Sequence, residues 1–94
     1  MSNNLSRNVY YNCYSDLQRS AKHLFLTPKS SVSITFLDHA FAILEKDKDA
    51  KVQKYCKTLK DIRNNIIDIP EQDVARTADK ILTIGILLKH MDTK

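Results

Sequence analysis

Glycine and proline are scarce in this chain, whose 94 residues include one Gly and two Pro. Sandwiches and barrels need Gly- and Pro-rich turns every few residues, so this scarcity counts against an all-β fold. The length matches one domain, residues 1–94, with a modest core and no room for a large internal active-site chamber. We therefore expect a single all-α domain.

Apolar side chains recur at helical spacing along three stretches of the chain. The first stretch predicts a helix over residues 5–26, which ends before Pro28 because the residue preceding a proline is pushed out of the α region. The second predicts a helix over residues 49–66 with Asp49 as its N-cap. The third predicts a helix over residues 70–91, with Pro70 and acidic residues in its first turn.

The segment between the first two helices has a mixed pattern. Residues 31–37 alternate polar and apolar side chains, which taken alone is typical of a strand. A strand here would lack a partner, so we predict a helix over residues 28–46, with Thr27 as N-cap and Pro28 at its first helical position. Because residues 47–49 contain neither Gly nor Pro, this helix could instead continue into the next one with a kink.

Every connection between these helices is short, which favours antiparallel neighbours. The expected architecture is an antiparallel, up-down four-helix bundle. The main alternative is a helical hairpin that completes its core by dimerisation.

The net charge of +4 is concentrated in one segment. Residues 46–63 hold seven basic and three acidic side chains, whereas the rest of the chain holds eight of each. Such an excess suits an acidic protein, nucleic acid or anionic lipid, although it is also typical of a solvated face. The candidate partner-binding residues of this basic face are Lys48, Lys51, Lys54, Lys57 and Lys60.

Gly85 lies in the middle of the most apolar predicted helix, where glycine costs about 1 kcal/mol relative to alanine. We therefore expect another helix to approach closely there. The residues around Gly85 are apolar on nearly every side, more than one bundle face can bury. Either the other helices enclose this end, or it forms a protein interface through Ile84, Gly85, Leu87 and Leu88, with a homodimer as the result.

Motifs for catalysis, cofactors and metals are missing from the sequence. A single glycine cannot form a phosphate-cradling loop, and no nucleophile elbow or zinc-protease helix occurs. The histidines, His23, His39 and His90, have no neighbouring ligand at helical spacing. We expect a protein that is not an enzyme and has no catalytic residues, cofactor or metal.

Two cysteines, Cys13 and Cys56, are too few for a disulfide framework and have no zinc-ligand spacing. We expect buried free thiols. The sequence shows neither the apolar core of a signal peptide nor a run long enough to span a membrane, so we expect a cytoplasmic location.

These features predict a regulatory protein-interaction module that binds another protein, one with an acidic surface, through the basic face or the apolar end. The alternative is a small nucleic-acid-binding regulator that uses the same lysines. Arg63 is the one arginine of residues 46–63 and Tyr55 the one aromatic, whereas base reading relies on Arg, Asn and Gln and single-strand binding on stacked aromatics.

The order of segments also resembles a known family. The chain resembles the enterocin-A-type bacteriocin immunity proteins in the order of four segments. These are the run from Leu44 to Lys48, an amphipathic helix to Asn65, a break at residues 68–70 and an amphipathic last helix. The similarity covers residues 37–88 and is one of size, pattern and charge. The resemblance implies a small, basic, cytosolic protein that folds as an antiparallel four-helix bundle. It also implies that the protein protects a bacteriocin-producing bacterium by binding a membrane permease to which the bacteriocin is bound, and that the C-terminal part determines specificity.

Overall fold

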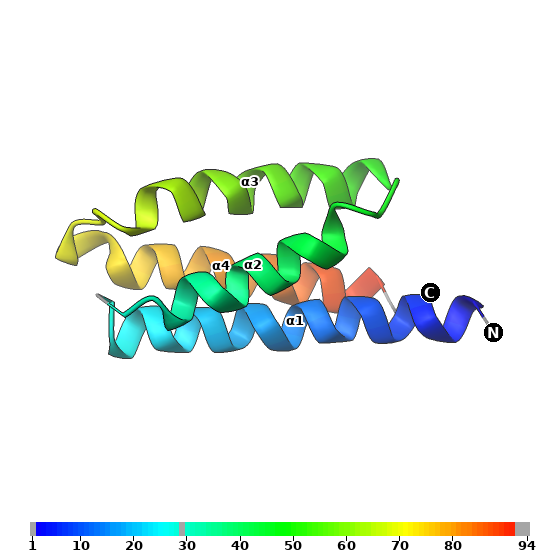
Figure 1. The fold of residues 1–94 in the computed structure, drawn as a ribbon, viewed down its shortest axis with the longest axis horizontal. Coiled ribbons are helices and arrows are strands. Elements are labelled where there is room, and N and C mark those ends of the chain that lie inside the picture. Colours follow the sequence, from blue (N-terminus) through cyan, green and yellow to red (C-terminus); the bar gives the residue numbers. More distant parts are fainter. Residues whose placement is uncertain (1, 29, 92–94) are drawn as a thin grey trace.

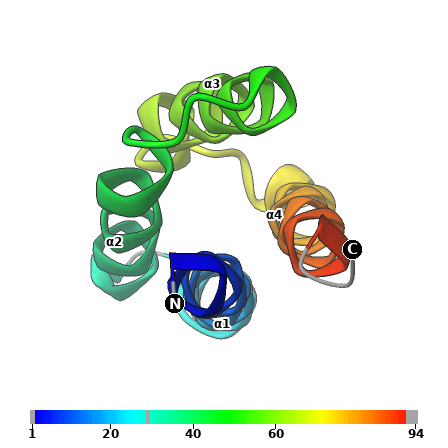
Figure 2. The same cartoon turned by 90° about the vertical axis from the view of Figure 1, so that its right-hand side faces the viewer.

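Four helices form the protein. The computed structural model describes the backbone of residues 2–28 and 30–91, with the side chains of this part described from residue 9 onward. The helices are α1 (Ser2–Leu26), α2 (Val32–Leu44), α3 (Ala50–Ile66) and α4 (Val74–Met91), and a one-turn 3-10 helix, η1 (Glu71–Asp73), leads into α4. Successive helices run antiparallel (Figure 1), and the view along the bundle places them around a common core in chain order (Figure 2). The predicted all-α four-helix bundle is confirmed.

The core contains the apolar stripes that the sequence predicted. Leu17, Leu37, Leu59 and Ile81, one from each helix, are fully inaccessible to solvent. Burying a leucine or isoleucine side chain contributes about 1.5–3 kcal/mol, so these stripes supply most of the drive for folding. Cys13 and Cys56 are buried and free of disulfides, as expected.

Helix α1 approaches α4 closely at Gly85. A Cβ atom added at Gly85 would lie 3.3 Å from Cβ of Leu17 and 3.4 Å from Cδ1 of Tyr14. The missing side chain therefore lets the two backbones come together, which confirms the expected close approach and identifies α1 as the neighbour. Close Cα approaches are far more frequent between α1 and α4 than between α3 and α4.

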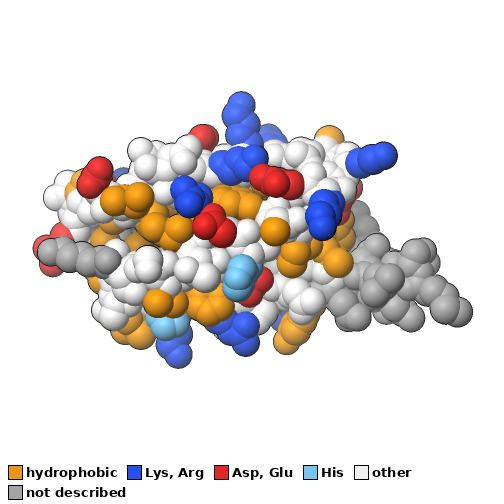
Figure 3. Space-filling view, viewed as in Figure 1, with side chains coloured by type: hydrophobic (Ala, Val, Ile, Leu, Met, Phe, Trp, Pro, Cys, Tyr) orange, Lys and Arg blue, Asp and Glu red, His pale blue; other side chains and the backbone are white. Residues whose placement is uncertain are grey.

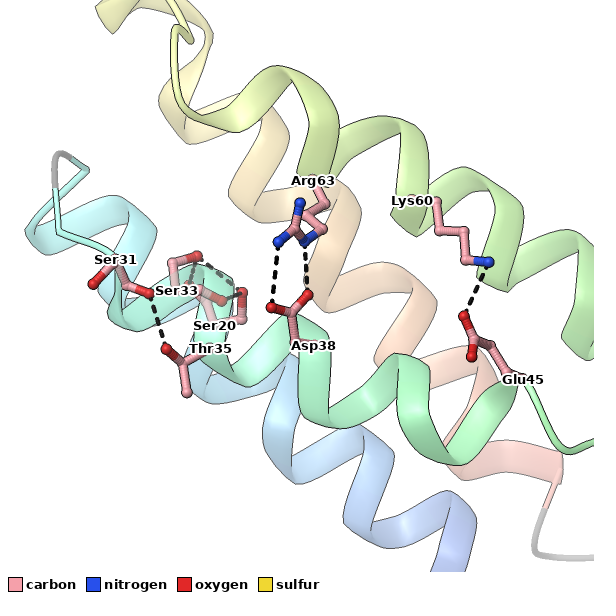
Figure 4. A network of polar contacts seen from close by, with 8 residues as sticks. All are labelled: Ser20, Ser31, Ser33, Thr35, Asp38, Glu45, Lys60 and Arg63. Carbon is pink, nitrogen blue, oxygen red and sulfur yellow. Dashed lines mark hydrogen bonds and ion pairs between the residues drawn. The ribbon is translucent and has the colours of Figure 1, made fainter.

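Helix α1 also approaches α2 through a pair of buried serines. Ser20 Oγ donates to the backbone oxygen of Ser33 at 2.9 Å, and Ser33 Oγ donates to the backbone oxygen of Ser20 at 3.0 Å. Both side chains are essentially inaccessible to solvent. These reciprocal hydrogen bonds satisfy both buried hydroxyls, so the pair joins the helices without an unpaired polar group (Figure 4).

Helix α2 is shorter than the predicted range of 28–46, and the proposed cap at Thr27 is wrong. The Thr27 hydroxyl donates backward to the carbonyl oxygen of His23, which completes the end of α1. Ser30 Oγ instead accepts from the backbone N–H of Val32, at the observed start of α2. Pro28 therefore belongs to the turn between α1 and α2. The strand-like segment is helical from Val32 onward.

Helices α2 and α3 are separated by residues 45–49, so they do not run together. The predicted N-cap is confirmed, because Asp49 Oδ1 accepts from the backbone N–H groups of Lys51 at 2.7 Å and Val52 at 3.4 Å. Helix α4 begins later than residue 70: Pro70 is extended and precedes η1, which holds Glu71 and Asp73. The acidic residues thus occupy the turn that leads into α4.

Candidate partner-binding surface

The five lysines of the predicted basic face are all exposed. Lys48 lies in the α2–α3 connection and the other four on α3, and Figure 3 shows Lys and Arg side chains projecting from this helix. Lys51 and Lys60 are nine residues apart, so they lie on opposite sides of α3, and Lys54 and Lys57 lie between them on its outer side. The basic face is therefore a band that crosses the helix obliquely.

The α2 side of this band is neutralised by ion pairs. Lys60 Nζ lies 3.0 Å from Oε1 of Glu45, and the Arg63 guanidinium donates to both carboxylate oxygens of Asp38, at 2.7 and 3.4 Å (Figure 4). The hydrogen bond from Lys60 to Glu45 raises the pKa of Lys60, and that from Arg63 to Asp38 raises the pKa of Arg63. Arg63 thus forms an ion pair that joins α3 to α2.

The remaining lysines of α3 are unpaired. Lys51, Lys54 and Lys57 make no ion pair with any residue in the described part of the chain. Their ammonium groups are available to an external acidic group, whereas that of Lys60 is already occupied by Glu45. The structure thus divides the five predicted residues into a paired edge and an open part.

The predicted apolar interface on α4 is largely core. Ile84, Gly85 and Leu88 are buried within this chain, against the other helices, and cannot present a surface to a second copy. Leu87 is 41% exposed. Of the two alternatives for this end of α4, enclosure by the other helices is correct for three of the four residues. Ile86, next to Leu87, is exposed as well, so part of the apolar surplus around Gly85 lies in the core of this chain and part at its surface.

Sequence reasoning missed a groove between α3 and α4. It has a volume of about 380 Å³. Its floor includes Ile62 and Ile69, which are only partly buried. Its remaining lining residues are polar or come from the turn: Thr58, Asp61, Asn65, Pro70, Asp73, Arg76, Thr77 and Lys80. No motif marks such a groove, because it arises where α3 and α4 make fewer close approaches than the other neighbouring helices.

A cluster of aromatic and charged groups lies on the opposite side, between α1 and α2. Phe36 stacks with His23 at a centroid distance of 5.8 Å, meets His39 edge-on at 6.1 Å, and lies 5.9 Å from the Arg19 guanidinium. Nearby, burial raises the pKa of Asp16, while the charges of His39 and Arg19 act in the opposite direction. His23 and His39 thus both lie against the Phe36 ring.

Two further findings concern the described residues. They contain no group of three or more His, Cys, Asp or Glu side chains arranged to hold a metal ion. Within the same residues, no helix combines the length and apolar character that a membrane crossing requires.

Comparisons of the chain with protein-family models, with curated proteins and with solved structures found no match. The observed small four-helix bundle agrees with the fold that the resemblance to bacteriocin immunity proteins implied, but no family match supports that assignment.

Proposed function

We propose that this protein is a non-enzymatic binding module that engages an acidic partner protein through Lys51, Lys54 and Lys57. The observation that carries the proposal is the division of charge on α3. The α2 edge of the helix is neutralised by Glu45 and Asp38, whereas these three lysines are exposed and unpaired within the described residues. Complementary charge speeds encounter and selects the partner, and unpaired lysines offer it without first breaking an internal contact.

The cytoplasm is the proposed location. Cys13 and Cys56 are buried and outside any disulfide in the described structure. Burial raises the pKa of the Cys56 thiol, which keeps it in the unreactive protonated form. Such thiols suit a reducing compartment.

The test starts with the partner. A pull-down from the native host, with mass spectrometry, names it, and calorimetry with the two purified proteins then measures the affinity. Reversing all three lysines to glutamate should weaken binding at least about tenfold at low salt, a loss of about 1.4 kcal/mol. Unchanged affinity would refute the proposal.

Matched single variants control for net charge. Lys57→Glu should weaken binding, whereas Lys22→Glu, which makes the same change at an exposed position of α1, should not. If the two variants weaken binding equally, the overall charge of the protein governs binding and the position of the lysine does not. Gel shifts with DNA and RNA at two salt concentrations test the nucleic-acid alternative: micromolar binding that falls steeply with salt would favour it over the protein partner.

Bacteriocin immunity is one concrete form of this proposal. The basic α3 and the bundle fold are what support it. A strain sensitive to an enterocin-A-type bacteriocin should survive exposure when it expresses this protein, and the triple Lys→Glu variant should restore killing. If cells with confirmed expression are killed as fast as the sensitive strain without the protein, bacteriocin immunity is refuted. The proposal that the protein binds an acidic partner would not be affected.

A further inference from the structure

Exposed apolar side chains gather at one end of the bundle, where the α1–α2 turn lies beside the connection that follows α3 (Figure 1). Of the seven large apolar side chains that are exposed in the described part of the chain, four lie at this turn end, and Ile67 is the most exposed, at 72%. The four are Phe25, Leu26, Val32 and Ile67. Apolar patches of this kind mark surfaces that another molecule covers. We propose that the turn end is the interface of a symmetric dimer, in which a second copy of the chain meets it end to end.

Two hollows open at the turn end. The larger, of about 520 Å³, lies between the α1–α2 turn and η1, and the smaller, of about 390 Å³, reaches the start of α2. Pro28, Ser30 and Ile67 line both hollows, so Ile67 borders open space on two sides. In a symmetric dimer the same surface of both copies forms the contact, so each copy must offer both a protruding side chain and space to receive one. The turn end offers both.

Charge is divided between the two sides of the turn end. Residues 22–32, which include the α1–α2 turn, contain two lysines and no acidic residue, whereas residues 66–74 contain three acidic residues and neither Lys nor Arg. Lys22, Asp68 and Glu71 are exposed and make no ion pair within the described residues. A two-fold axis that crosses the end between its two sides brings the lysine side of each copy against the acidic side of the other. The turn end is therefore complementary in charge to itself, which favours a second copy.

Other occupants fit this charge pattern less well. An anionic membrane or an acidic protein would meet the carboxylates of Asp68 and Glu71, which are exposed beside the apolar residues. The proposed partner-binding lysines of α3 lie nine or more residues before its end at Ile66, which is at least about 13 Å along the helix. The chain can therefore form the dimer and bind the acidic partner at the same time.

The size of the turn end limits the strength of the dimer. The bundle measures 43 Å in its longest dimension but only 20 and 18 Å across. An interface confined to so narrow an end falls near or below the lower limit of stable protein interfaces, about 1,200 Å² in total, where association is weak and reversible. We expect a dissociation constant of about 0.1–1 mM.

Sedimentation equilibrium tests self-association directly. Between about 20 μM and 1 mM protein, the weight-average mass should rise from that of one chain, 10.8 kDa, by at least about a third. Ile67→Arg places a charge on an already exposed side chain, so the variant should fold and its mass should stay constant. Ile86→Arg, at an exposed position of α4, is the matched control and should associate as the wild type does. A constant mass for the wild type, or a rise that Ile67→Arg leaves unchanged, would overturn the inference.

Charge reversal tests the symmetry of the dimer. Lys22→Glu and Glu71→Lys should each weaken self-association at least about fivefold, because each variant puts like charges at both contacts of the dimer. An equal mixture of the two variants should associate at least about fivefold more tightly than either variant alone, because both contacts of the mixed pair again join opposite charges. A mixture no tighter than the separate variants would overturn the two-fold arrangement and with it the inference.

The partner assay separates the dimer from the proposed function. At about 10 μM the protein should be monomeric, so Ile67→Arg should bind the acidic partner as tightly as the wild type does. If Ile67→Arg weakens that binding, the turn end serves the partner and not a second copy, while the lysines of α3 keep their own test. If the triple lysine reversal leaves the affinity for the native partner unchanged, the proposed function fails, and sedimentation alone decides on the dimer.

Discussion

Helix α1 contacts its neighbours through small residues: Gly85 admits Leu17 on one side, and Ser20 meets Ser33 on the other. Helix α3 contacts α2 through exposed ion pairs and leaves a groove beside α4. Close packing gains dispersion and hydrophobic free energy over every atom pair, whereas exposed ion pairs contribute about 0–1 kcal/mol each. One bundle therefore combines a closely packed half around α1 with a half around α3 that also buries core residues such as Leu59 but leaves its charges and a groove exposed to solvent.

The largest expected effect is at the α1–α4 contact. Gly85→Leu forces a side chain into Leu17 and should lower the free energy of unfolding by about 3 kcal/mol, the upper end of the usual cost of overpacking. Urea denaturation measures this. The control is Thr83→Leu, an exposed position two residues away, which should change stability by less than about 0.5 kcal/mol. A Gly85→Leu protein as stable as wild type would mean that α1 and α4 are not close packed.

The serine pair should have the next largest effect. Ser33→Ala leaves Ser20 buried with one partner fewer and should cost about 1–2 kcal/mol. Because the two hydroxyl oxygens also lie within hydrogen-bond distance of each other, at 2.9 Å, Ser20→Ala together with Ser33→Ala should cost less than the sum of the single variants. Ser31→Ala, two residues before Ser33 but exposed and without a side-chain cap bond, serves as control. Additive costs for the pair would show that the two hydroxyls act independently.

The α2–α3 ion pairs should matter less. Asp38→Asn removes the charge opposite Arg63 and should cost less than about 1 kcal/mol, because both side chains are partly exposed. The cost should shrink further in 1 M NaCl, where the screening length is about 3 Å. Asp79→Asn, an exposed carboxylate without an ion pair in the described residues, is the matched control. A cost above 2 kcal/mol, independent of salt, would contradict the division between the two halves.

The smallest expected effect is a pH dependence at Asp16. Burial raises its pKa above the ordinary 3.8, so the folded protein favours the protonated carboxyl. Its contribution to stability is therefore complete below the unfolded pKa and is lost as pH rises through the folded pKa. Asp16→Asn stays neutral, so relative to wild type it should gain less than about 1 kcal/mol between pH 3 and pH 7. A variant that becomes relatively less stable over this range would show that attraction to His39 and Arg19 outweighs burial.

Sequence periodicity was sufficient for the elements with strong apolar stripes. Leu17 and Leu59 belong to rows of apolar residues at helical spacing, and these rows predicted α1 and α3. The side chain of Asp49 is of a type that caps helices, so it predicted where α3 starts. The start of α2 was missed because Thr27 can either cap the next helix or hydrogen-bond back to His23, and only the packed structure decides between the two.

The candidate surface was only partly predictable. The sequence gives the positions of the lysines along the chain, but it does not say which of them form ion pairs. Lys60 contacts Glu45 only when α2 and α3 pack side by side. The burial of Ile84 and Leu88 was likewise undecided until α1 took its place at Gly85. Ser20 and Ser33 carry no apolar signal at all. The groove depends on how closely α3 and α4 approach each other in the folded bundle, which no single stretch of sequence expresses.

The two buried thiols allow the two halves of the bundle to be compared by their rates of chemical modification. Cys13 belongs to α1 and Cys56 to α3, and both are inaccessible in the closed bundle. A thiol-specific reagent must wait for each one to be uncovered, so its rate reports how often that helix opens. If Cys56 is modified faster than Cys13, then α3 separates from the core more often than α1 does.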